Sequence, residues 1–408
     1  MNLLLYHYSN DSVVKMKWIS PHTITGSPAE NEKYLRRQYI NDEFWEFVEA
    51  GKHILFTAPR RIGKSSVMKD LEKECPEGYL VIYEDIESDK DQQAFFKRLY
   101  ELLLTRLGKK AKWKKLTSWV KSREIGEVSV EGSISFVSNE LDYKGELLAL
   151  IQELKNESLQ VVMLLDEFPD VLQSIYDNDG AQIAIDTLHT LREIRHKSEF
   201  ASFTLVFAGS IGLRHVVSKI DGRLKLTNDL EPIYIDQLDV AEAKELINQL
   251  LDGASMSVQG EVLDYMLERI GYLLPYFVQL MLDKSNRILR RQKRTDLTKD
   301  DVDAAFQAVV EEGRNFDDWK KRLSKYLRVS DANFCLGMLT RYAHYDNYLL
   351  QQALNYAQEV KPETHYKELL DDVLVKDGYL AKEGQRYYFQ SPFLREWWKE
   401  RHPKIEID

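Results

Sequence analysis

The residues with the clearest chemical potential are Gly63, Lys64 and Ser65, within the stretch KHILFTAPRRIGKSS at 52–66. This stretch begins with the apolar run 54–56, which predicts a short buried strand. A loop follows, and beyond it apolar residues recur every four positions, as on an amphipathic helix. Strand, loop, Gly-Lys-Ser and helix together are the context of a phosphate-binding P-loop. The alternative is a surface loop that carries the triplet by chance.

A P-loop binds phosphate through its backbone N–H groups and through the N-terminus of the following helix. Lys64 is expected to reach the β- and γ-phosphates, and the Ser65 hydroxyl to ligate Mg²⁺. Ala58 replaces the first glycine of the motif, which matters only if that position needs a positive φ. The residues expected to bind the nucleotide are Ala58, Pro59, Arg60, Arg61, Ile62, Gly63, Lys64, Ser65 and Ser66.

A second group of candidate residues lies in QVVMLLDEFPDVL at 160–172. Five apolar residues predict a central strand that ends at Asp166 and Glu167. A carboxylate at the end of a strand beside the P-loop can hold Mg²⁺, usually through the water shell of the ion, which is the role expected for Asp166. Glu167 is expected to be the general base that orients and deprotonates the attacking water. The alternative is a strand followed by an acidic helix N-cap.

A third candidate position follows the predicted strand SFTLVFAGS at 202–210. The strand ends in a small polar tip, where Ser210 could sense the γ-phosphate; a simple strand-to-turn transition is the alternative. Arg214 and Arg223 follow and could act as arginine fingers in trans, or could simply be solvated.

Strands and helices alternate around these residues, which predicts an α/β fold with a mostly parallel sheet and right-handed crossovers. A β-hairpin is predicted at 127–136. The remaining predicted strands lie at 79–85 and 232–238, and the helices at 91–107, 143–156 and 180–197.

The strands stop after residue 238. Helical patterns follow at 239–251, 259–270, 275–292 and 298–311.

The segment 329–408 shows three helical patterns, a hairpin turning at Glu383–Gly384 and a terminal helix, which is a winged-helix outline. Its helix at 363–376 carries more acid than base, which favours protein interaction over DNA binding. The expected domains are an N-terminal extension (1–22), a P-loop ATPase core (23–238), a helical lid (239–328) and a winged-helix domain (329–408).

The composition narrows the class of protein. With 408 residues and a net charge of −10, the surface as a whole is no nucleic-acid platform. Local basic clusters at 108–123 and 286–294 remain open as contact sites for nucleic acid or an acidic partner, or as solvated helices. Two cysteines are too few for a disulfide framework, and no apolar run is long enough to span a bilayer. A cytoplasmic protein without membrane contact is expected.

Taken together, these motifs resemble the prokaryotic ATPases of the archaeal-type group, at the border of the AAA+ and STAND families. The resemblance covers about residues 23–400. It rests on TGSP at 25–28, APRRIGKSS at 58–66, LLDEFPDVL at 164–172, AGSIGLR at 208–214 and PYFVQL at 275–280.

The resemblance implies a core sheet in the order 5-1-4-3-2, a helical lid and a C-terminal winged helix. It also implies ATP with Mg²⁺ as the bound cofactors. The roles that it implies are Lys64 and Ser65 at phosphate and metal, Asp166 at metal, Glu167 in water activation, Ser210 in sensing and Pro275 in the lid contact with the nucleotide.

Three functions are compatible with these features. The first is an ATP-hydrolysing molecular switch that controls self-assembly or a protein partner. The second is a DNA-associated AAA+-type ATPase that uses the winged helix and the basic clusters. The third is a scaffold that binds ATP but scarcely hydrolyses it, which the presence of Glu167 argues against. A GTPase is disfavoured because no Asn-Lys-x-Asp motif is present.

Overall fold

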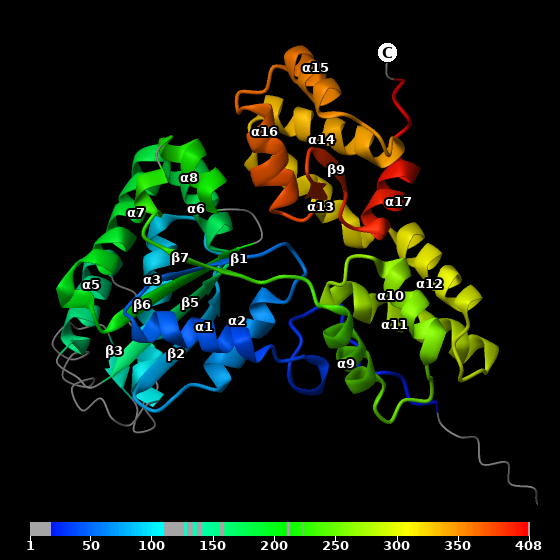
Figure 1. The fold of residues 1–408 in the computed structure, drawn as a ribbon. Coiled ribbons are helices and arrows are strands. Elements are labelled where there is room, and N and C mark those ends of the chain that lie inside the picture. Colours follow the sequence, from blue (N-terminus) through cyan, green and yellow to red (C-terminus); the bar gives the residue numbers. More distant parts are fainter. Residues whose placement is uncertain are drawn as a thin grey trace, which may run out of the picture.

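A five-stranded parallel sheet lies at the centre of the N-terminal part of the chain, up to residue 238 (Figure 1). Its order is β2-β5-β6-β1-β7, which confirms the expected order 5-1-4-3-2 once the separate hairpin strands are left out of the count. The strands are β1 (Ile54–Thr57), β2 (Tyr79–Asp85), β5 (Gln160–Asp166), β6 (Phe203–Gly209) and β7 (Glu231–Tyr234). This computed structural model describes residues 18–109, 126–128, 134–136, 141–155, 159–209, 213–222 and 224–406.

Alternating side chains of the buried strands enter two different hydrophobic clusters. On β5, Val162 and Leu164 belong to the cluster that includes α1 and α2, whereas Val161, Met163 and Leu165 belong to the cluster on the other face. This is the two-residue period of a strand covered on both faces. The helices of this part of the chain are α1 (Gln38–Glu49), α2 (Lys64–Lys73), α3 (Gln92–Lys109), α5 (Tyr143–Leu154), α6 (Phe168–Asp179), α7 (Ala181–His196) and α8 (Leu213–Asp221).

The predicted hairpin is present as β3 (Gly126–Val128) and β4 (Ile134–Phe136), which pair antiparallel. Most of the basic segment 108–123 lies outside the described residues, as do Ser210 and Arg223.

Four helices follow the sheet, within one residue of the predicted ranges. Local signals explain the agreement, since Asp239 and Glu242 form a capping box at the start of α9 and Pro275 is the first residue of α11. The four helices are α9 (Val240–Leu251), α10 (Gly260–Ile270), α11 (Pro275–Gln292) and α12 (Lys299–Glu312), and together they are called the lid below. A fifth helix, α13 (Arg314–Tyr326), was not predicted, although Phe316, Trp319 and Leu323 form a buried stripe with helical spacing along it.

The remaining residues form a C-terminal unit, defined here as 329–406. It has the predicted order of three helical segments, a hairpin and a last helix, and it stacks on α10 and α12 of the lid (Figure 1). Its elements are α14 (Val329–His344), α15 (Leu350–Val360), α16 (Tyr366–Glu368) with η4 (Leu369–Val375), β8 (Leu380–Glu383), β9 (Arg386–Phe389) and α17 (Pro392–Arg401).

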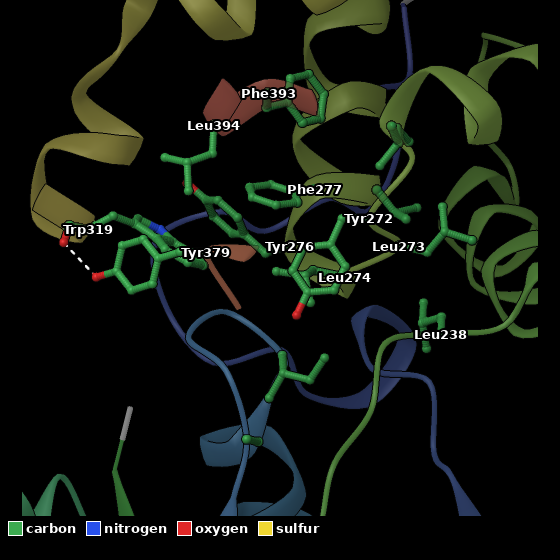
Figure 2. Packing of buried hydrophobic residues seen from close by; sticks show 14 of the residues in the cluster. Leu238, Tyr272, Leu273, Leu274, Tyr276, Phe277, Trp319, Tyr379, Phe393 and Leu394 are labelled. Carbon is green, nitrogen blue, oxygen red and sulfur yellow. Dashed lines mark hydrogen bonds between the residues drawn. The ribbon is translucent and has the colours of Figure 1, made fainter. Parts of the chain in front are cut away.

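Aromatic side chains join the C-terminal unit to the lid. Phe393 of α17 lies 4.6 Å from Phe306 and 5.4 Å from Phe277 between ring centroids. Figure 2 shows Phe393 and Leu394 close to Phe277 and Tyr276, and all four belong to one hydrophobic cluster. The lid and the C-terminal unit therefore share one hydrophobic core, which also reaches α2 and one face of the sheet.

Candidate nucleotide site

The carboxyl ends of three neighbouring strands bring the predicted site residues together. Thr57 at the end of β1 pairs with Gly209 of β6, and Leu165 of β5 pairs with Phe207 of the same strand. The P-loop leaves β1 at this edge, and Asp166 ends β5 beside it. Ligands of open α/β sheets bind at this edge. Ser210 follows β6 directly but lies outside the described residues.

The P-loop backbone takes left-handed conformations at two positions, Arg61 with φ 67° and Gly63 with φ 100°. Ala58 has no positive φ, so the missing first glycine causes no backbone strain there. The Ile62 side chain is fully buried in the core, which leaves only the backbone of this residue available to a nucleotide.

Lys64 opens helix α2 and is 6% exposed. Its ammonium donates hydrogen bonds to the carbonyl oxygens of Ala58 and Pro59, both at 3.1 Å. The ammonium therefore lies folded back across the loop. Burial lowers the pKa of Lys64, and the carboxylates of Glu167 and Asp166 oppose that shift. A buried cation held within the loop suits the binding of an anionic ligand.

The expected metal ligands lie within hydrogen-bonding distance of each other. The Ser65 hydroxyl donates to Asp166 Oδ2 at 2.5 Å, and the Tyr83 hydroxyl donates to the same oxygen at 3.3 Å. A hydroxyl and a carboxylate oxygen side by side fit Mg²⁺, which prefers oxygen ligands and usually keeps waters and substrate phosphates in its remaining positions. The described residues contain no cluster of three or more His, Cys, Asp or Glu side chains suited to a metal.

A cavity lies between this sheet edge and the lid. Its N-terminal wall is the segment 24–29, called the arm below, which is fixed by two hydrogen bonds: Ile24 N donates to Gln279 Oε1 at 2.7 Å, and Ala29 N donates to Ser66 Oγ at 2.8 Å. The other lining residues are Arg60, Arg61, Gly63, Lys64, Ser65, Ser66, Glu167, Pro275, Tyr276 and Gln279.

The cavity therefore unites most of the predicted nucleotide-binding residues, including the distant Pro275. Ala58, Pro59 and Ile62 do not line it, and the first two contribute carbonyl oxygens to Lys64 instead. The guanidinium of Arg61 lies 4.5 Å from the ring centroid of Tyr276, so the P-loop already contacts the lid.

Glu167 lines the cavity from the start of α6, where its φ of 56° is unusual for a residue other than glycine. Burial raises the pKa of the Glu167 carboxyl, and the positive charges of Arg322 and Lys64 act against that rise. A partly buried carboxylate with a perturbed pKa in a cavity is a candidate catalytic base.

Helix α13 brings residues to this site that the sequence analysis missed. Arg322 lies 3.7 Å from Glu167 and 3.8 Å from Asp170 of α6, measured between nitrogen and carboxylate oxygen. Lys325 donates to Asp170 at 2.8 Å, and Tyr326 also donates to this carboxylate. Although burial alone would raise it, the pKa of Asp170 is held below its usual value by these donors and by Arg322.

The C-terminal unit reaches the P-loop directly. Gly378 lies against Pro59. A methyl group added at Gly378 would come within 2.9 Å of the Pro59 side chain and of the Tyr272 hydroxyl. The P-loop residue Arg60 pairs with Asp318 of α13 at 3.2 Å. The Tyr379 hydroxyl donates to the Trp319 carbonyl at 2.7 Å (Figure 2). Helix α13 is thus held between the P-loop and the C-terminal unit.

Two solved structures share the fold of this chain. The Walker-type ATPase paby2304 of Pyrococcus abyssi superposes with a TM-score of 0.61 over 92% of this chain and 99% of that chain, at 16% identity. The ORC2 protein of Aeropyrum pernix, solved as ADPNP-ADP complexes, superposes with a TM-score of 0.52 over 93% of this chain and 95% of that chain, at 13% identity. The fold is that of an archaeal-type AAA+ P-loop ATPase.

In this ATPase fold, the cavity lies at the strand ends that carry the P-loop. No protein-family model matches the sequence, and no curated protein matches it either. Across the described parts of the chain, no helix has the length and apolar character needed to cross a membrane.

Proposed function

We propose that this chain is an ATP-binding and ATP-hydrolysing molecular switch that controls self-assembly or a protein partner. The observation that carries the proposal is the double contact of the P-loop. On one side the loop lines the cavity, and on the other it contacts the C-terminal unit at Pro59 and α13 at Arg60. A nucleotide that alters the loop can therefore alter how the C-terminal unit packs.

The arrangement supports binding of a nucleotide triphosphate. The base would lie between the arm and the lid residues Pro275 and Tyr276, and the phosphates at the P-loop. Lys64 would exchange its two carbonyl acceptors for phosphate oxygens. Ser65 and Asp166 would hold Mg²⁺, which neutralises charge on the phosphates when bound.

Hydrolysis requires a base near the terminal phosphate. Glu167 is a carboxylate in the same cavity, and we assign to it the orientation of the attacking water and the acceptance of its proton. The presence of Glu167 favours a switch that resets by hydrolysing ATP. A scaffold that only binds ATP would not need this residue.

We propose that the C-terminal unit is a winged-helix domain. Two contacts favour protein binding over DNA binding as its role. The helix that would enter DNA is α16 with η4, and its Asp371 is paired with Lys382 and Tyr387 of the hairpin. The ring of His215 in α8 hydrogen-bonds the carbonyl of Asp372 at 2.9 Å. In this arrangement the segment faces the ATPase core rather than a nucleic acid.

The experiment that tests the switch is hydrogen–deuterium exchange of the full chain without nucleotide, with ADP and with a non-hydrolysable ATP analogue. We expect the amides of α13 and of residues 376–379 to differ in protection between the ADP and ATP-analogue states. Equal protection in the two states would contradict the switch.

The DNA-associated alternative is tested by ATP turnover with and without double-stranded DNA at low and moderate salt. Stimulation that fades as salt rises would favour it, because phosphate contacts are salt-dependent. We expect turnover that does not respond to DNA.

A further inference from the structure

Arg322 is the side chain of α13 that reaches the candidate catalytic base. It lies between Glu167 and Asp170, with nitrogen–oxygen distances of 3.7 and 3.8 Å. The exposed fractions of the three side chains are 12%, 23% and 3%, so the group is largely screened from water. The same nitrogen, Nη2, makes both contacts, and a positive charge between two carboxylates favours the orientation in which both face it.

The rest of α13 holds Arg322 in place. Phe316, Trp319 and Leu323 bury one face of the helix in the core. Lys325 and Tyr326 anchor the end of the helix on Asp170, the carboxylate that Arg322 also contacts. The guanidinium is therefore presented to Glu167 by a helix with several independent attachments.

The ion pair does not take Glu167 out of the cavity. Glu167 lines the cavity together with Lys64 and Ser65, whereas Arg322 is not among the lining residues. Arg322 thus contacts the base without occupying the phosphate site. This geometry fits a group that orients the base better than one that blocks it.

We propose that Arg322 is a positioning residue for ATP hydrolysis, which acts through Glu167 and makes turnover depend on α13 being docked against α6. The proposal rests on the function proposed above. It extends that function because α13 leads directly into the C-terminal unit, so displacement of this unit would withdraw Arg322 and leave bound ATP unhydrolysed for longer.

The test is single-turnover hydrolysis of labelled ATP at saturating enzyme, together with equilibrium ATP binding, for the full-length wild type and variants. Arg322→Gln should lower the hydrolysis rate by roughly 10- to 100-fold, as expected when a catalytic group is misplaced by about 1 Å. The Kd for ATP should stay within about threefold, because Arg322 does not line the cavity. Arg322→Lys keeps the charge but not the planar fork and should recover part of the rate.

Lys321→Gln is the matched control, since it removes a positive charge from an exposed position of the same helix. It should leave the rate unchanged. In a Glu167→Gln background, Arg322→Gln should change the rate by less than about twofold, because the group through which it acts is already absent. A purely structural effect would instead persist in that background.

An unchanged rate in Arg322→Gln would overturn the proposal, as would an equal loss in the Glu167→Gln background. If Arg322→Gln does not fold, Arg322→Lys is measured instead, against the wild type and in the Glu167→Gln background. Wild-type turnover that depends on Glu167 but not on Arg322 would overturn this inference alone. Absence of turnover in the wild type would overturn the proposed function and this inference with it.

Discussion

The Ser65 hydroxyl hydrogen-bonds the Asp166 carboxylate across 2.5 Å, although 101 positions separate the two residues in the chain. Ser65 stands at the start of α2 and Asp166 at the end of β5, so the parallel sheet is what brings them together. The pair marks the place where a P-loop and a strand-end carboxylate can share one cation.

Lys64→Ala should weaken ATP binding by roughly 10- to 100-fold, since a hydrogen bond from a charged group is worth about 1.5–3 kcal/mol. Isothermal titration calorimetry with ATP measures the change. Lys73→Ala is the control, because Lys73 lies on the same helix and its ammonium donates to the Asn31 side chain, away from the P-loop. Wild-type affinity in Lys64→Ala would contradict the phosphate role.

Glu167→Gln should keep ATP affinity while lowering kcat by about 10²- to 10⁴-fold, the range that a positioned general base contributes. Steady-state phosphate release and ATP binding measure the two effects separately. Glu87→Gln removes an exposed carboxylate near the end of β2 and should change neither quantity. Normal hydrolysis in Glu167→Gln would show that another group activates the water.

Gly378→Ala should push the C-terminal unit away from the P-loop. The added methyl group would lie 2.9 Å from both the Pro59 side chain and the Tyr272 hydroxyl, so one side of the contact must shift. Small-angle X-ray scattering should show a larger radius of gyration than in the wild type.

Gly384→Ala is the matched control for this variant. Gly384 also has a positive φ, 61° against 79° at Gly378, but nothing lies within 4 Å of the added methyl group. Gly384→Ala therefore introduces the same kind of backbone strain as Gly378→Ala, but its methyl group contacts no neighbouring residue. If both variants scatter alike, contact with Pro59 does not hold the unit in place.

Asp377 should make stability depend on pH. Burial raises the pKa of this carboxyl from 3.8 to about 7, and the charges of Arg322, Lys64 and Lys376 only partly oppose the rise. Between these two values the native state keeps a proton that the unfolded state has released. Stability is therefore greatest below this window and is lost as pH rises through about 7.

Asp377→Asn should remove this loss, because the amide cannot ionise. Its melting temperature should exceed that of the wild type by a few degrees at pH 8 and should match it near pH 4. Glu368→Gln removes an exposed acid from the helical segment that precedes Asp377 and should shift neither value. A pH-independent difference between Asp377→Asn and the wild type would refute the assignment.

The sequence alone determined the parts of this protein that local chemistry specifies. The P-loop is recognisable because glycine, lysine and serine must follow one another there, and helix α11 is predicted at its observed bounds because proline starts it and apolar residues recur along it. The resemblance carried by these motifs also supplied the sheet order, which the structure confirms.

Only the tertiary structure decided which distant groups meet at the site. The apolar spacing of Phe316, Trp319 and Leu323 was present in the sequence and predicts a helix, but nothing in it singles out Arg322 among the basic residues of α13. Lys325 meets Asp170 across 155 positions, and Gly378 meets Pro59. Such contacts depend on how whole helices pack. An ion pair forms wherever packing brings two opposite charges together, and the neighbours of either residue in the chain do not reveal this.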